Sequence, residues 1–456
     1  MKALLKIHGQ VTRAVRRFGR HENLFVMGGN REMASAVPRN PPPSGAHDLV
    51  FPPMPRCAAL ALLVAGVGAA LSTVPARAQA RYVNLTLSTQ YDDNLQRLPS
   101  EQKALQPHSG QEITTRIGAG AGVVAELGLI DLRVDGSVAK RLFAYNDELN
   151  TDEYQLAGRA DYQALSGAAT LEALVSRENL AFNDPIFRGT SVRDLIRFAA
   201  EGDRRLIGNI RLAGSASFQS SSSPDAILSR ADNDRYSYSV GLSYVSPLEN
   251  RLEIGYSESI AEGGKERTIV VQNVPIFYSS DATDRSAYGE VEYAPSVLLS
   301  VTARAGYTWH NDRSVLDADF QGLTHAASVT WSPRESLAIV AATSRSFSSN
   351  DELFANGVKS STFSLSVRGE AFQRVTITAR ARHTERNFRY DLQADTPTVT
   401  PRSDQFLVLE AHSQYQTGIG IAVGLQLRHT VVEDTAAEET IRDNSVMLTL
   451  SRTFEL

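Results

Sequence analysis

Residues 299–310 read LSVTARAGYTWH, and this stretch contains the pattern that decides the fold. Apolar residues occupy every second position from Leu299 to Trp309, and the positions between them hold Ser, Thr, Arg and Gly. Successive side chains of a β-strand point to opposite faces, so this alternation predicts a strand with one apolar and one polar face. Residues 419–428, IGIAVGLQLR, repeat the pattern closer to the carboxyl end.

Alternating runs of this kind fill the chain after Ala80, and the run at 191–202 alternates least clearly. The boundaries of such runs are good to about two to four residues. The candidate strands are 81–91, 112–126, 129–143, 152–165, 168–179, 191–202, 206–219, 233–246, 250–261, 284–295, 298–310, 321–332, 336–348, 360–372, 374–386, 404–416, 419–432 and 444–456.

The gaps between these runs predict the architecture. Every second gap is long, as at 262–283 and 387–403, whereas the gaps between the long ones hold only a few residues. Outer-membrane barrels have short periplasmic turns, long external loops and an even number of strands. A bilayer also requires the sheet to close and the apolar face to point outward. The sequence therefore predicts an all-β protein, a single transmembrane antiparallel β-barrel of about 18 strands over 81–456, with short periplasmic turns and long extracellular loops.

Composition and charge exclude several other classes of protein. No stretch approaches the roughly 20 apolar residues of a membrane-spanning helix. The 456 residues carry a formal net charge of −5, although residues 1–80 hold ten Lys and Arg against three Asp and Glu. The folded part is therefore acidic, which argues against a nucleic-acid partner. A single cysteine, Cys57, excludes a disulfide framework and a cysteine-based metal site, and we expect no cofactor.

The first eighty residues have the features of a targeting segment. Residues 58–71 carry no charge, follow Arg56 and precede overlapping Ala-x-Ala sites that end at Ala78 and Ala80. This arrangement predicts a secretory signal peptide over 54–80, cleaved after one of these two alanines. Residues 1–53 are basic and then Pro-rich; they either precede the true start codon or extend the signal peptide, and we expect no folded structure there. The predicted destination is the outer membrane of a Gram-negative cell.

The polar positions of the strands would line the lumen of the barrel. They hold Ser, Thr, Gly and Gln together with charged residues, and their arginines are the candidate site residues. Guanidinium groups bind carboxylates bidentately, so these arginines either guide an anionic chain or pair with acids on neighbouring strands and brace the wall. Ser, His and Asp residues do not converge by register, so we expect neither an enzyme nor a metal site. The candidate lumen arginines are Arg304, Arg368, Arg380, Arg382 and Arg428.

One local motif follows the first predicted strand. Tyr91, Asp92, Asp93 and Asn94 are consecutive, and Arg97 comes three residues later. This motif resembles the opening of the EpsL-type exopolysaccharide-operon barrels, a branch of the Putative beta-barrel porin 2 families. Gln96 departs from the aromatic or large apolar residue usual there. The resemblance implies that the chain moves a polysaccharide out across the outer membrane, beside periplasmic export and polymerisation proteins.

Three functions are compatible with these features of the sequence. The first is a passive conduit for a secreted exopolysaccharide, and the second is a general or substrate-selective porin for small solutes. The third is a non-transporting surface adhesin or scaffold that uses the external loops. The expected partners are outer-membrane lipid, lipopolysaccharide and the polysaccharide chain. The acids of the predicted loop 433–443, such as Glu433 and Asp443, are either solvated or bridge to lipopolysaccharide through divalent cations.

Overall fold

The structure is a computed structural model. It describes residues 77–105, 107–179, 192–224, 232–263, 267–271, 274–278, 281–312, 320–348, 358–388, 402–434 and 439–455. The predicted extension 1–53 and the predicted signal peptide as far as residue 76 lie outside these residues. Among the described segments, none of the helices has the length and apolar character needed to cross a membrane.

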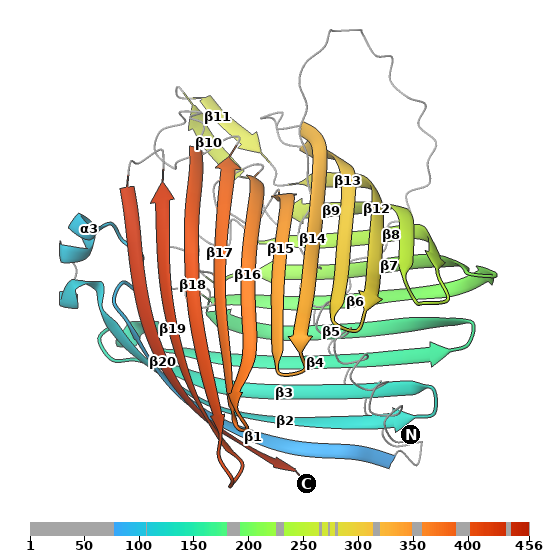
Figure 1. The fold of residues 1–456 in the computed structure, drawn as a ribbon. Helices are drawn as coiled ribbons and strands as arrows, with labels where there is room; N and C mark the ends of the chain where they lie inside the picture. Colours follow the sequence, from blue (N-terminus) through green and yellow to red (C-terminus); the bar gives the residue numbers. More distant parts are fainter. Residues whose placement is uncertain are drawn as a thin grey trace.

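Eighteen strands form one closed antiparallel sheet, as the alternation predicts (Figure 1). The least regular run becomes a complete strand, β6, that pairs with both of its neighbours. The strands are β1 Arg77–Asp92, β2 Glu112–Leu127, β3 Ile130–Phe143, β4 Thr151–Ala164, β5 Gly167–Asn179, β6 Val192–Ile207, β7 Ile210–Ser222, β8 Asn233–Val245, β9 Arg251–Gly263, β12 Ala282–Ser296, β13 Leu299–Asp312, β14 Phe320–Arg334, β15 Leu337–Ser348, β16 Val358–Phe372, β17 Val375–Phe388, β18 Arg402–Gln416, β19 Ile421–Asp434 and β20 Glu439–Glu455.

The first and last strands close the barrel. β1 pairs with β2 on one side and with β20 on the other, from Tyr82 opposite Glu455 to Asp92 opposite Ser445. Cleavage after Ala78 or Ala80 would therefore leave this β1–β20 seam complete. Strands of the near wall cross those of the far wall steeply in Figure 1, because barrel closure requires the strands to tilt.

The outer surface of the barrel is the apolar one. Leu427 on β19 and Leu448 on β20 are exposed, as are outward-facing apolar side chains on most of the other strands. Exposed aromatic side chains lie near the ends of several strands, where a bilayer has its interfaces. At the periplasmic side these are Tyr162, Tyr244, Tyr293, Trp331 and Tyr415.

Small apolar clusters lie on the inner surface near the external end. Phe406 and Val408 on β18 pack with Val432 on β19 and Ile441 on β20. Near the external ends of the strands, inward-facing side chains such as Thr430 are buried, whereas lower on the wall they are partly exposed. The inner surface is thus most tightly packed at its external third.

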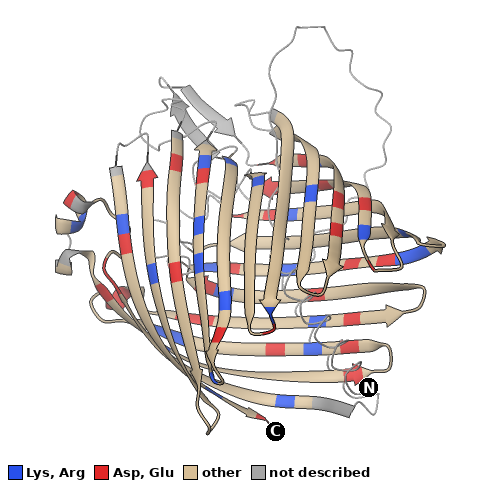
Figure 2. Cartoon of the chain, in the orientation of Figure 1, with Lys and Arg blue, Asp and Glu red and all other residues tan. Residues whose placement is uncertain are grey.

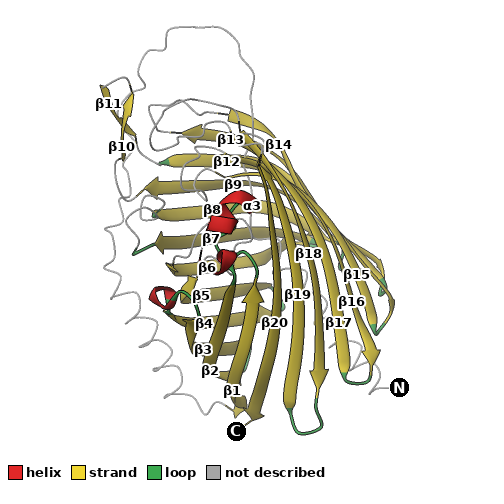
Figure 3. Ribbon diagram, turned by 90° about the vertical axis from the view of Figure 1, so that its left-hand side faces the viewer, coloured by secondary structure: helices red, strands yellow, loops and turns green. Residues whose placement is uncertain are grey.

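The loops differ in part from the prediction. β19 extends to Asp434 and β20 begins at Glu439, so the predicted loop 433–443 is too long and its Asp443 is a buried strand residue. Short elements that period-two alternation cannot predict lie in the external loops. They are the helices α3 Ser100–Leu105, η1 Pro107–Gly110 and η2 Asp147–Leu149 and the hairpin β10 Arg267–Val271 with β11 Val274–Tyr278. Of these, α3 contacts β20, near the rim seen in Figure 3.

Candidate functional site: the polar lumen and the strand seam

Hydroxyl groups form ladders across the inner surface of neighbouring strands. Thr308 on β13 donates a hydrogen bond to Ser286 on β12 and shares another with Thr324 on β14. On β16 and β17, Thr362 and Thr384 are paired in the same way. The lumen wall is therefore built from groups that hydrogen-bond to one another and to water, and eighteen strands enclose a channel wide enough for water.

Four of the five candidate arginines lie on one section of this wall, which we call the arginine wall (β16–β19; Figure 2). Arg380 on β17 and Arg428 on β19 stand opposite Glu410 on β18, one on each side. The Nε of Arg428 lies 3.7 Å from Oε1 of Glu410. Arg368 on β16 and Arg382 on β17 share the inward face with them. This placement supports the bracing interpretation at Glu410 while keeping the four positive charges close together.

A fifth arginine of this wall, Arg386, is absent from the predicted set. It lies on β17 an even number of residues from Arg380 and Arg382, so it faces the lumen as they do. Its Nη2 donates a 2.7 Å hydrogen bond to Oδ2 of Asp404. Its guanidinium also lies over the ring of Phe406. The alternation of faces along the predicted strand 374–386 already indicated that Arg386 faces inward. Among the described side chains facing the lumen from β16–β19, five arginines stand against three carboxylates, Glu370, Asp404 and Glu410.

Arg304 lies apart from the arginine wall. It is on β13, and β14 and β15 separate it from β16. Its guanidinium lies 3.5 Å from the ring centroid of Tyr288 and 3.4 Å from Oε2 of Glu290. Tyr288 in turn donates a 2.9 Å hydrogen bond to the buried Glu253. Arg304 thus makes its contacts on the β12–β13 wall, and the five candidates do not form a single patch.

The wall on the other side of the seam is acidic. Inward positions of β1–β5 carry more carboxylates than arginines, and many of the charges are paired across strands. Arg116 and Arg141 both bind Glu153, each at 2.7 Å. Arg159 binds Asp161 of its own strand at 2.8 Å and also contacts Glu172 on β5. The seam therefore separates a wall with excess negative charge from the arginine wall.

The motif after β1 ties the first loop to the last strand. The Nδ2 of Asn94 donates hydrogen bonds to the carbonyl oxygens of Leu98, at 2.9 Å, and of Arg442 on β20, at 3.0 Å. Its Oδ1 accepts a 3.0 Å bond from the Leu98 N–H. Asp92 Oδ1 accepts a 2.9 Å bond from the Asn94 N–H. The residues that carry the family resemblance thus have a structural role at the seam.

Asp93 and Arg97 complete this connection. Asp93 donates its N–H to the carbonyl of Asn444, and its carboxylate accepts bonds from the N–H and the Nδ2 of Asn444, each at 2.8 Å. Arg97 adopts a left-handed backbone with φ of 52° and lies 3.7 Å from Asp443. Tyr91 is on the outer face of β1 and is exposed. Spacing alone could not predict that the motif would meet a strand at the far end of the chain.

Asn94→Ala should lower the free energy of unfolding by about 1–3 kcal/mol, because Asn94 is 1% exposed and makes three side-chain hydrogen bonds. Asn84→Ala, on β1, is the matched control and should have little effect, since Asn84 is only half-buried. Equilibrium unfolding of the purified barrel in urea measures both. Equal losses for the two variants would contradict the role assigned to Asn94.

Comparison with known proteins gives one family match and several structural likenesses. A family model described as Putative beta-barrel porin 2 matches residues 277–454, which include β12–β19 and most of β20. No curated protein matches the chain. The chain is similar in structure to OccAB3 of Acinetobacter baumannii, at 12% identity and a TM-score of 0.44, covering 82% of this chain and 99% of that one. It is also similar to OccK2 of Pseudomonas aeruginosa in complex with glucuronate, at 12% identity and a TM-score of 0.44, covering 83% and 98%.

The fold and the family match define a broad class. A closed 18-stranded barrel with an apolar outer surface is an outer-membrane protein. The family match over 277–454 is to a β-barrel porin. Such a fold is typical of channels that do no chemistry. The predicted class and location therefore agree with these findings, whereas the exopolysaccharide assignment remains a prediction.

Proposed function

We propose that this protein is a passive outer-membrane channel for small hydrophilic solutes. The observation that carries the proposal is the inner surface of the barrel. Hydroxyl ladders such as Ser286–Thr308–Thr324 alternate around it with ion pairs between neighbouring strands, such as Arg159–Glu172 and Arg428–Glu410. Such a surface is wetted and offers many weak contacts, which lets a polar solute enter and leave.

The arginine wall would give this channel its selectivity. Its arginines outnumber its carboxylates, so an anionic solute would pass closer to β16–β19 than to the acidic β1–β5 wall. The ion pair of Arg428 with Glu410, across which Arg380 also stands, keeps the contact of each arginine with a solute weak. We therefore expect a moderate preference among solutes by charge, and no tight binding.

Reconstitution of the purified full-length protein tests the proposal. In planar bilayers it should give stepwise ohmic conductance, and liposomes that contain it should swell in small neutral sugars within minutes. Protein-free liposomes and liposomes with heat-unfolded protein are the controls. Correctly inserted protein that gives neither conductance nor swelling would contradict the channel and would favour the surface-scaffold function.

A second candidate is the export of a polysaccharide through the same lumen. The feature that favours it is the resemblance of residues 91–97 to exopolysaccharide-operon barrels. The seam contacts of Asn94 give these residues a structural reason to be present whatever the lumen carries, so the motif does not by itself distinguish export from solute passage. Loss of surface polysaccharide on deletion, restored by the full chain, would place export before solute uptake.

A further inference from the structure

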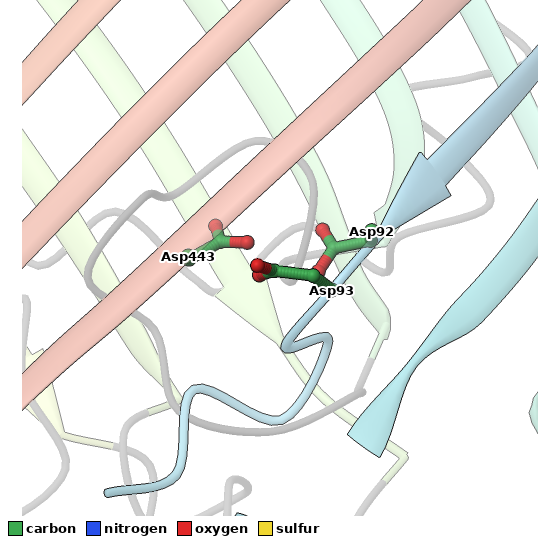
Figure 4. A group of neighbouring side chains, drawn as sticks. All are labelled: Asp92, Asp93 and Asp443. Carbon is green, nitrogen blue, oxygen red and sulfur yellow. The ribbon is translucent and has the colours of Figure 1, made fainter. Parts of the chain in front are cut away.

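Three carboxylates converge at the external end of the β1–β20 seam. Asp92 ends β1, Asp93 follows it in the first loop, and Asp443 points toward both from β20 (Figure 4). One carboxylate oxygen of each lies within 4.8 Å of the other two. Asp92 is 4% exposed and Asp443 is 2% exposed, while Asp93 forms the open side of the group. Buried carboxylates this close together require either positive charge nearby or a bound proton.

The cations of the chain supply this charge only in part. The Nε of Arg97 lies 3.7 Å from Oδ2 of Asp443, and the Nζ of Lys103 lies 3.8 Å from Oδ1 of Asp93. These two cations face three carboxylates, which leaves one negative charge in excess when all three carboxylates are ionised.

A second observation is independent of the carboxylate cluster. Thr430 on β19 stands directly opposite Asp443, on the same inward face, and is 1% exposed. Within the described part of the chain, Oγ1 of Thr430 is buried without a hydrogen-bond partner, and so is Oδ1 of Asp443. A buried oxygen that accepts nothing destabilises a folded protein, and such atoms require an explanation. A bound ion between the two strands would satisfy both oxygens.

We propose that Asp92, Asp93, Asp443 and Thr430 form a calcium site that joins the ends of the barrel. All of its donors are oxygen atoms, which is the donor set of Ca²⁺ and Mg²⁺. Ca²⁺ suits it better, because Ca²⁺ accepts six to eight oxygens in irregular geometry, whereas Mg²⁺ demands a near-ideal octahedron. Water would complete the coordination on the Asp93 side. Such a site needs only the modest affinity, Kd of about 10⁻⁴–10⁻³ M, of extracellular calcium modules.

The site would stabilise the contact between the first and last strands. Its four donors come from β1, the first loop, β19 and β20, so a bound ion would link residues at the two ends of the chain. A ligand that binds the folded barrel alone also raises its stability by mass action. This role is separate from transport, and its test does not depend on whether the lumen conducts solutes.

The proposal is tested by treating the purified full-length protein in detergent with EDTA, removing the EDTA and then titrating with Ca²⁺. Isothermal titration calorimetry should show one Ca²⁺ per chain, and 10 mM Ca²⁺ should raise the Tm by a few degrees. Asp443→Asn should weaken Ca²⁺ binding at least tenfold, and Thr430→Val should weaken it several-fold. Asp404→Asn is the matched control, since Asp404 is an equally buried lumen carboxylate already paired with Arg386. It should leave Ca²⁺ affinity unchanged.

Several outcomes would overturn the site. Wild-type protein that binds no Ca²⁺ at 10 mM would show that Arg97, Lys103 and protonation of the carboxylates neutralise the group. Tighter binding of Mg²⁺ than of Ca²⁺ would exclude the calcium assignment. Equal weakening by Asp404→Asn and Asp443→Asn would show that binding is nonspecific. If Asp443→Asn does not fold, Thr430→Val decides the matter: weaker Ca²⁺ binding supports the site, and unchanged binding contradicts it.

Discussion

Leu427→Arg should lower the free energy of unfolding by about 2–4 kcal/mol, the cost of an arginine at the midplane of a bilayer on the lipid face of a barrel. Leu427 is 46% exposed on the outer surface of β19. It lies four residues along the strand from Val423, which stands opposite Tyr415 of the periplasmic aromatic band. Leu427 is therefore within the apolar belt, where a guanidinium has no water.

Val423→Arg is the matched control for this prediction. At the level of Tyr415 it lies near the interface, where the cost of an arginine falls to about 0–1 kcal/mol. Urea unfolding in lipid vesicles, followed by tryptophan fluorescence, measures both variants, since the chain contains two tryptophans. Equal costs for the two substitutions would mean that the depth assigned to β19 is wrong.

Replacing Arg368, Arg380, Arg382 and Arg428 together with Gln should shift the ion selectivity of the channel clearly toward cations. The variant keeps polar side chains of similar length but removes four positive charges from one wall, leaving its carboxylates in excess. It should still insert and show heat-modifiable migration, because Gln retains hydrogen-bonding capacity toward Glu410. Reversal potentials in a salt gradient across a planar bilayer provide the measurement.

Single substitutions provide the comparison. Each alone should change the reversal potential little, since water and salt in the lumen screen an individual charge to about 1 kcal/mol or less. Arg304→Gln should also have little effect, because Arg304 stands against Tyr288 and Glu290 on a different section of the barrel. An unchanged selectivity in the quadruple variant, if it inserts normally, would mean that these arginines only brace the wall.

Much of the fold could be predicted from period-two alternation, because a bilayer outside and water inside impose opposite requirements on the two faces of every strand. Alternation fixes which face a residue occupies but says nothing of its depth. Val423 and Val301, for example, alternate as clearly as Leu427, yet they stand opposite Tyr415 and Tyr293 of the aromatic band. The depth of each residue in the bilayer follows only from the register between neighbouring strands.

The site was predictable to a smaller degree. Alternation along the strands placed four arginines on the inner face, where the structure has them: Arg368, Arg380, Arg382 and Arg428. The same alternation continues to Arg386 at the end of the predicted strand. Partners such as Glu410 depend on the stagger between strands, which the sequence of one strand does not contain. Asp443 looked like a loop residue because its strand begins with five polar or charged residues among six, Glu439 to Asn444. Polar residues at a strand end are acceptable there, since they lie beyond the apolar belt.

The seam also determines the order in which this protein can assemble. Asp93 and Asn444 are hydrogen-bonded although 351 positions separate them in the chain, so the seam is among the last contacts a growing polypeptide could form. Contacts of such long sequence separation carry a large loop-closure entropy and slow folding. Until β20 arrives, β1 has an unpaired edge, and every strand presents its apolar side to water. The chain must therefore cross the periplasm in a state that is open and prone to aggregation, and delivery to the membrane has to outpace that aggregation.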